Sequence, residues 1–182
     1  MSFFTTLSEF DQRISNRIRL PEQAGFTRRI ASFFAHSGDS WFCLAAMGIL
    51  WLFTHNPWHR LMALMGVSTV VLALVVFGVK FLIRRRRPEG DWGAIYRNTD
   101  PHSFPSGHAA RTAMLALLGF ALGPLWLGIV LALWAPLVGL ARVMMGVHYV
   151  SDVLAGAAFG LLFGWGFLFI TDFLIRLVPF IF

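Results

Sequence analysis

The residues of this chain that could do chemistry are cations, two of its histidines and one aspartate, and they stand at the ends of long apolar runs. Cationic side chains bind phosphate oxygens, and an imidazole can attack phosphorus or carry a proton. Such a set could hold a phosphate ester and cleave it without a metal ion. The candidates, in chain order, are Lys80, Arg87, Ser106, Gly107, His108, Arg142, His148 and Asp152.

Lys80 is the only lysine among 15 basic residues, and it follows a long apolar run, where a charge is costly and usually functional. Arg87 lies two helical turns further on, so a continuing helix would place both side chains on one face. The alternative for Lys80 is a lysine that reaches from its helix to the membrane surface. Residues 84–87 are all arginine, and we expect only some of them to face a ligand.

The segment Pro105-Ser106-Gly107-His108 is expected to open a helix. The N-terminus of a helix has free backbone N–H groups, and these bind anions. Gly107 permits close approach of the backbone, Ser106 adds a hydroxyl donor, and His108 is placed to face the same anion. The alternative is a capped helix start that happens to carry a histidine.

His148 and Asp152 are four residues apart, so on one helix the carboxylate can hold one imidazole nitrogen. The other nitrogen then presents its lone pair outward, as in a catalytic triad. The alternative is a purely structural hydrogen bond, but a buried aspartate in a span is usually functional. Gly156, Gly160 and Gly164 continue the same stripe, which indicates close helix packing toward the bundle interior.

Membrane helices must position these residues. The chain has 182 residues, of which 57% are hydrophobic and only 13% charged, whereas an average soluble domain has about 25% charged residues. We therefore expect an all-α, polytopic transmembrane helical bundle. Five segments approach the roughly 20 apolar residues that a bilayer requires. They are predicted near residues 39–55, 59–83, 107–122, 125–142 and 149–176.

Two interfacial helices are predicted before the spans, in residues 3–20 and 25–37. Residues 3–20 place apolar side chains on one face and polar ones elsewhere, which is typical of an amphipathic helix on a membrane surface. An ordinary surface helix is the alternative. The apolar face would carry Phe3, Leu7, Phe10, Ile14 and Ile18, whereas Asp11, Arg13, Arg17 and Arg19 would lie elsewhere.

We expect one domain, residues 1–182, with interfacial helices in 1–38 and a transmembrane catalytic bundle in 39–182. Five spans would bring the three groups of candidates, and the polar connection 84–105, to one membrane face. The polar, basic N-terminus argues against a cleavable signal peptide. The single cysteine, Cys43, excludes an internal disulfide and a cysteine metal site.

Together the motifs resemble those of the type 2 phosphatidic acid phosphatase (PAP2) superfamily. They read Lys-x6-Arg-Pro, Pro-Ser-Gly-His and Arg-x5-His-x3-Asp, in that order. The resemblance implies a helical-bundle phosphatase that uses no metal or cofactor and forms a covalent phosphohistidine. It implies that His148 is the nucleophile, that Asp152 orients it and that His108 is the general acid. It implies that the phosphate is held by Lys80, Arg87, Arg142 and the backbone at Ser106 and Gly107.

Two features depart from the family pattern. The third motif begins Ala141-Arg142, where the family usually has Ser-Arg, and this removes one hydrogen bond to the phosphate. Members of the family often have six spans rather than five. A metal site built on His148 and Asp152 is disfavoured because the nearby cations would repel the ion and no third acidic ligand is in register.

The expected function is that of an integral membrane phosphatase whose partners are the bilayer and a phosphorylated lipid. Polyprenyl diphosphate, phosphatidylglycerol phosphate and phosphatidic acid are the expected substrate classes. A lipid phosphotransferase that uses the same phosphohistidine, and a non-catalytic protein that binds anionic lipid, are the alternatives. Vanadium haloperoxidases share the site pattern but are soluble, so the spans exclude them.

The net charge of +6 could indicate a nucleic-acid partner, but the basic residues cluster at membrane edges, so we expect lipid phosphates instead. The positive-inside rule places the N-terminus and the site on the cytoplasmic face of a bacterial-type inner membrane. The resemblance favours the outer face of the membrane, because the active site of many bacterial members of the family faces outward. The sequence pattern specifies no oligomeric state.

Overall fold

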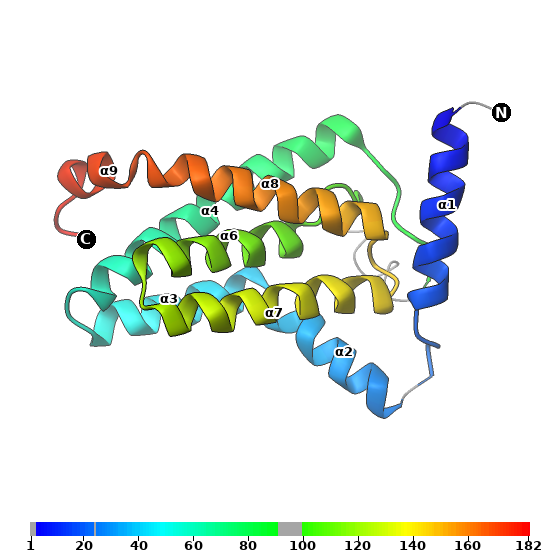
Figure 1. Cartoon of the computed structure of the whole chain (residues 1–182), viewed down its shortest axis with the longest axis horizontal. Coiled ribbons are helices and arrows are strands. Elements are labelled where there is room, and N and C mark those ends of the chain that lie inside the picture. Colours follow the sequence, from blue (N-terminus) through cyan, green and yellow to red (C-terminus); the bar gives the residue numbers. More distant parts are fainter. Residues whose placement is uncertain (1–2, 24, 91–99) are drawn as a thin grey trace.

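The computed structural model describes residues 3–23, 25–90 and 100–182, and within them the chain is all-helical (Figure 1). The one β pairing among these residues is an isolated bridge between Arg86 and His102. The all-α expectation is therefore confirmed. The described helices are α1 (Phe3–Ile18), α2 (Phe26–Ser37), α3 (Ser40–Phe53), α4 (Trp58–Ile83), α6 (Gly107–Leu122), α7 (Leu125–Met144), α8 (Val150–Leu168) and α9 (Thr171–Leu177).

Helix α6 forms the centre of the bundle and packs against α4, α7 and α8 (Figure 1). Its residues Ala110, Met114 and Leu118 recur every fourth position and are completely buried. This i,i+4 repeat is the stripe that a helix presents to one neighbour. Helix α3 pairs with α4 as a hairpin, and the short helix α2 packs against α7.

The predicted glycine stripe of α8 lies against α6. A Cβ atom at Gly156 would collide with the backbone of Ser106, and one at Gly160 would collide with the carbonyl of Ala110. Glycine lets the two backbones approach more closely than any other residue would allow. The stripe therefore fixes the start of α8 beside the start of α6, where candidate residues of both helices stand.

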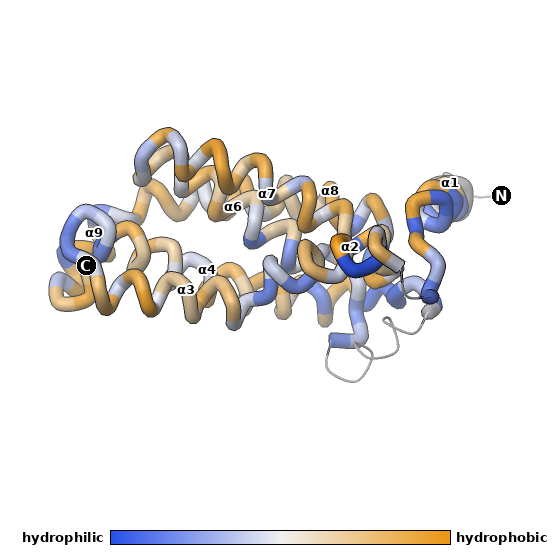
Figure 2. Tube along the Cα trace, turned by 90° about the horizontal axis from the view of Figure 1, so that it is seen from below, coloured by the Kyte–Doolittle hydropathy of each residue, from blue (hydrophilic) through white to orange (hydrophobic). Residues whose placement is uncertain are grey.

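The helices of the bundle are mostly hydrophobic along their length, and hydrophilic residues gather at the end near α1 and α2 (Figure 2). Leu74, Leu133 and Leu162, on three different helices, each expose about two thirds of their surface, as lipid-facing side chains do. Helices α4, α7 and α8, with 26, 20 and 19 residues, are long and apolar enough to cross a membrane. The chain is thus a multi-pass membrane protein.

Helices α3 and α6 are apolar but shorter, with 14 and 16 residues. At 1.5 Å per residue they measure about 21 and 24 Å, against a hydrocarbon core of about 30 Å. The five-span topology therefore stays a prediction.

The last predicted span, 149–176, is wrong in its extent. Helix α8 ends at Leu168, and a turn leads into the separate helix α9. The Thr171 hydroxyl donates to the Leu168 carbonyl over 2.8 Å, which closes α8 and opens α9. The chain then folds back, so that Trp51 Nε1 donates to the Ile181 carbonyl over 2.8 Å. The polar pair Thr171-Asp172 therefore interrupts what reads as one apolar run.

The contact between α6 and α8 can be tested with two alanine substitutions on α8. Gly160→Ala should lower the free energy of unfolding by about 1–3 kcal/mol, because the added methyl group overpacks a backbone contact. Gly166→Ala is the control, since a Cβ there meets no atom within 4 Å. Thermal unfolding of the detergent-purified variants measures both. Equal stability of the two variants would contradict the close packing.

Candidate active site

The predicted site residues meet at the end of the bundle where α6 and α8 begin and α4 and α7 end. They surround a cavity of about 150 Å³. Residues from α4, α6, α7 and the α7–α8 turn contribute to its wall. The prediction that residues from the three groups of candidates meet at one place is therefore confirmed. The predicted residues that line it are Lys80, Gly107, His108, Arg142 and His148, whereas Arg87, Ser106 and Asp152 are buried behind them.

The route from Lys80 to Arg87 differs from the prediction of a continuing helix. Arg84 adopts a left-handed conformation (φ 53°) and its N–H donates to the Lys80 carbonyl, which ends α4. The chain then runs extended, so successive side chains point to opposite sides. Arg84 and Arg86 are exposed, whereas Arg85 and Arg87 turn inward. Only alternate arginines of the cluster therefore reach the site.

Lys80 and Arg87 converge on one carboxylate. Lys80 Nζ lies 2.5 Å and Arg87 Nη2 lies 2.7 Å from the same oxygen, Oδ2 of Asp100. Both cationic side chains are almost fully buried, at 5% and 1% exposure. The second oxygen of Asp100 is buried and accepts no hydrogen bond within the described residues. The carboxylate thus occupies the position between the two cations that an anionic ligand would take.

Helix α6 starts at Gly107, as predicted, but Ser106 is fully buried and does not line the cavity. Ser106 is the N-cap residue, and its hydroxyl oxygen accepts from the Ala109 N–H over 3.4 Å. The Ser106 N–H donates to the main-chain carbonyl of Asp152 over 2.9 Å, which ties the start of α6 to α8. Gly107 lines the cavity, so the N-terminal end of α6 faces it. A helix N-terminus carries partial positive charge and favours an anion there.

His148 stands in the turn between α7 and α8. Its Nε2 atom lies 3.3 Å from Arg87 Nη1, and a guanidinium has no lone pair, so Nε2 must be the acceptor. The ring proton is then on Nδ1, which lies 3.5 Å from Oδ2 of Asp152. This is longer than a good hydrogen bond, as catalytic contacts often are before a substrate binds. The arrangement leaves the Nε2 lone pair directed toward the cations.

The protonation state of His148 follows from its surroundings. Burial lowers the pKa of His148 well below its ordinary value, and the charges of Arg87, Arg142 and Lys80 lower it further. The ring is therefore neutral at pH 7. A neutral imidazole is the form that can act as a nucleophile.

His108 has an aspartate partner that the sequence analysis missed. Its Nε2 atom lies 2.6 Å from Oδ1 of Asp39, and the other oxygen of Asp39 lies 3.2 Å from His36 Nδ1. Asp39 is the N-cap residue of α3 but does not cap its own helix, because its carboxylate contacts His108 and His36 instead. Since Nε2 donates to Asp39, the second nitrogen of His108, Nδ1, is the one available to a ligand.

Arg111 fixes the turn that carries Asp39. It lies on α6 one turn after His108, its guanidinium donates to the Gly38 carbonyl, and its Nη1 lies 2.5 Å from Ser40 Oγ. The sequence did carry a signal for Asp39. It is the only acidic residue between Glu22 and Glu89, and it stands at the start of an apolar run. A charge in that position is usually functional.

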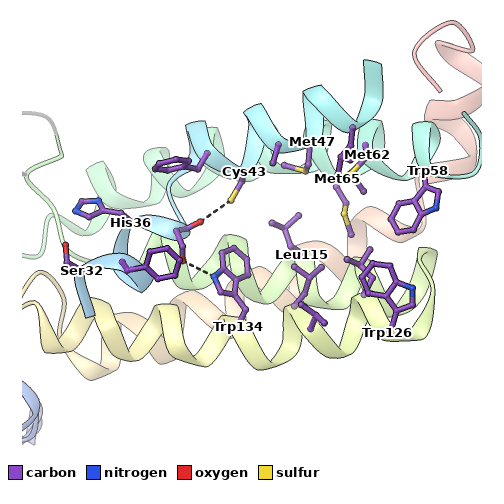
Figure 3. Close-up of a pocket in the computed structure, with 18 residues that line it drawn as sticks. Ser32, His36, Cys43, Met47, Trp58, Met62, Met65, Leu115, Trp126 and Trp134 are labelled. Atoms are coloured by element: carbon purple, nitrogen blue, oxygen red, sulfur yellow. Dashed lines mark hydrogen bonds between the residues drawn. The ribbon is translucent and has the colours of Figure 1, made fainter. Parts of the chain in front are cut away.

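A second, larger cavity of about 730 Å³ runs as an apolar groove between α3 and α7, with Leu115 of α6 in its floor (Figure 3). Trp58 and Trp126 stand at its far end, with ring centroids 5.8 Å apart. His36 stands at the other end, and Trp134 lies between the two ends (Figure 3). Through His36 the groove reaches the hydrogen-bonded pair of Asp39 and His108.

The position of Asp100 between two cations can be tested with an anion. Asp100→Asn should bind inorganic phosphate or vanadate roughly tenfold more tightly, because the ligand no longer displaces a carboxylate, and one tenfold step is about 1.4 kcal/mol. Isothermal titration calorimetry of the purified protein measures the change. Asp172→Asn, on the exposed surface of α9, is the control. Weaker binding by Asp100→Asn would show that Asp100 supports the anion site rather than occupying it.

Comparisons with known proteins agree with this site. The family model of the PAP2 superfamily matches residues 61–176. Decaprenylphosphoryl-5-phosphoribose phosphatase of Mycobacterium tuberculosis is 40% identical over 139 residues, which are 74% of this chain and 73% of that protein. Lipid A 4'-phosphatase of Bacteroides thetaiotaomicron is 43% identical over 69 residues, which are 37% and 31% of the two chains.

Solved structures share the fold. The PAP2-type phosphatidylglycerolphosphate phosphatase of Bacillus subtilis superposes with a TM-score of 0.73 at 25% identity, over 92% of this chain and 87% of that one. LpxE of Aquifex aeolicus superposes with a TM-score of 0.65 at 23% identity, over 88% and 93%. The chain therefore belongs to the PAP2 superfamily.

Proposed function

We propose that this protein removes a phosphate group from a membrane lipid through a phosphohistidine at His148. The observation that carries the proposal is the placement of His148. Its Nε2 lone pair faces buried cations, its Nδ1 proton faces Asp152, and His108 lines the same cavity. Nucleophile, anion site and proton donor thus share one small cavity, as phosphoryl transfer to a side chain requires.

The reaction runs in two balanced steps. In the first, the Nε2 lone pair of His148 attacks phosphorus, the bond from phosphorus to the lipid oxygen breaks, and Nδ1 of His108 gives that oxygen a proton. In the second, water attacks phosphorus, the bond from phosphorus to Nε2 of His148 breaks, His108 takes a proton from the water, and inorganic phosphate leaves. Asp152 stabilises the positive charge that develops on the His148 ring.

Charge stabilisation comes from the protein itself. The phosphate oxygens would be held by Lys80, Arg87, Arg142 and the backbone N–H groups at the start of α6. These donors are fixed before the substrate arrives, and fixed donors in a buried site stabilise a transition state strongly. Asp100 has to leave its position between Lys80 and Arg87 when the phosphate enters.

A lipid with a single long apolar chain, such as a polyprenyl carrier, is the substrate class that the groove supports. The leaving oxygen lies at His108, so the body of the lipid extends toward Asp39 and His36, where the groove begins. The groove runs along α7 from Trp134 to Trp126, a rise of roughly 12 Å at 1.5 Å per residue. A single apolar chain can lie along this groove. The mycobacterial relative is named for a decaprenyl substrate.

We further propose a bacterial-type plasma membrane with the site on the cytoplasmic face. Arginines that contact none of the candidate residues lie at the site end of the molecule, and a positive excess marks the cytoplasmic side. The arginines counted are Arg13, Arg17, Arg28, Arg29, Arg84 and Arg86.

A phosphate-release panel tests the proposal. Detergent-purified protein should release phosphate from a polyprenyl-linked phosphosugar faster than from phosphatidylglycerol phosphate or phosphatidic acid. His148→Ala should lower this turnover more than roughly 10³-fold, as removal of a nucleophile does. His55→Ala, an exposed histidine at the far end of the bundle, is the control. Turnover by His148→Ala near that of the wild type would contradict the mechanism.

The pH profile tests the two histidines separately. Because the pKa of His148 is lowered, the acid limb of kcat/KM should lie well below pH 6.5. Asp39→Asn should leave that limb in place and move the alkaline limb to lower pH, because a protonated His108 loses its carboxylate partner. Steady-state rates between pH 4.5 and 9.5 give both limbs.

The choice of leaving group is the internal control for Asp39. The loss of activity in Asp39→Asn should shrink with a nitrophenyl ester, whose leaving oxygen needs no proton. An equal loss with all leaving groups, together with an unmoved alkaline limb, would assign Asp39 to folding rather than to proton transfer.

A further inference from the structure

Helix α1 lies across the site end of the bundle, beside the end of α7 and the start of α8 (Figure 1). Its sequence predicts an amphipathic surface helix with Asp11 on the polar side. In the structure Asp11 and Ser15, one turn apart, are buried, at 9% and 5% exposure. Phe10, predicted on the apolar face, is 62% exposed. The helix therefore uses a polar edge to dock on the bundle and leaves an apolar residue facing outward.

Asp11 and Ser15 supply hydrogen-bond acceptors to the start of α8. The Ser151 N–H donates to Asp11 Oδ1 and the Val150 N–H donates to Ser15 Oγ, each over 3.0 Å. The Ser151 hydroxyl donates to Asp11 Oδ2 over 2.5 Å. The first amides of a helix have no partner within the helix. Here another helix caps them, in the segment that carries His148 and Asp152.

Arg85 links the same carboxylate of α1 to the site. Its Nη2 donates to Asp11 Oδ2 and its Nη1 donates to Asp152 Oδ1, each over 2.6 Å. The guanidinium also lies 4.2 Å from the centroid of the Tyr149 ring. A guanidinium is planar and rigid, so two carboxylates bound to its two ends fix each other's positions. Asp11 and Asp152 are held in this way.

We infer that Asp11 is a positioning residue, which holds Asp152 in register with His148 by way of Arg85. The inference rests on the proposed function, because it concerns the orientation of the proposed nucleophile. Asp152 Oδ1 accepts from Arg85, whereas Oδ2 accepts from the Tyr149 N–H over 2.9 Å and lies 3.5 Å from His148 Nδ1. Without the Asp11 carboxylate, Arg85 turns both of its ends to Asp152. That bidentate pairing draws the second carboxylate oxygen away from Nδ1 of His148.

If Asp11 only attached α1 to the bundle, a different experimental result would be expected. Asp11 then matters only because it attaches α1 to α8, and Ser15 matters for the same reason. Ser15 contacts the Val150 amide but has no hydrogen bond to Arg85 among those of the described residues. Ser15→Ala therefore loosens the same helix contact and leaves the bridge intact, which makes it the matched control. Glu9→Gln, on the exposed side of α1, is the second control.

The experiment measures kcat, KM and Tm for the full-length protein in detergent. Asp11→Asn should lower kcat about 10- to 100-fold, the range for residues that support a catalytic group from behind it, with KM changed by less than about twofold. Ser15→Ala should keep kcat within about twofold even where its Tm falls. In an Asp152→Asn background, Asp11→Asn should have no further effect on kcat, because it acts through Asp152.

Arg85→Lys is the second test and does not require Asp11→Asn to fold. An ammonium group cannot bridge two carboxylates at fixed ends, so kcat should fall as in Asp11→Asn. The inference is overturned if both variants keep near-normal kcat, or if Ser15→Ala loses as much kcat as Asp11→Asn. His148→Ala distinguishes a failure of the proposed function from a failure of the positioning role of Asp11. If it stays active, the proposed function fails, and if it is inactive while Asp11→Asn is fully active, only the positioning role fails.

Discussion

The three cationic side chains proposed to hold the phosphate are buried around one cavity in a membrane protein, and the rest of the site is arranged around them. They are Lys80, Arg87 and Arg142. Burying an unpaired charge costs several kcal/mol, and like charges in a low dielectric repel each other. The protein offsets part of this cost with Asp100, which contacts two of the three, and with the Val147 carbonyl, which accepts from Arg87. On the proposed function, a phosphate group would contribute further compensation. The repulsion among these cations therefore favours an anionic ligand.

Asp39 and Asp152, the carboxylates next to the two histidines, contact different partners. The two histidines therefore have different surroundings. Asp39 contacts the imidazoles of His108 and His36. Asp152 is paired with Arg85, and burial together with the charges of Arg87, Arg142 and Lys80 lowers the pKa of His148. Different environments around two titratable groups are what assign acid and nucleophile in an active site. The glycine contact between α6 and α8 then holds both histidines at one cavity.

Much of the site could be predicted from the sequence because its motifs are local. The start of α6 at Ser106 and the pairing of His148 with Asp152 depend on spacings of a few residues, and both appear in the structure. The partners that were missed come from distant segments. Asp39, Arg85 and Asp11 reach the site through contacts across 67 to 74 positions in the chain, and a single sequence does not display such contacts. The predicted helix from Lys80 to Arg87 was wrong for a local reason. Arg84 adopts a left-handed conformation, and the sequence gives no signal for it because the residue is not glycine.

The central claim is that the phosphoryl group passes through His148, and a quenched reaction tests it directly. The wild-type protein is mixed with a ³²P-labelled lipid phosphate, stopped in alkali within milliseconds, digested and analysed by mass spectrometry. The account predicts a label that is stable in alkali, labile in acid and located on the peptide that contains His148. A label on another residue, or turnover of the lipid with no labelled protein at any time, would contradict it.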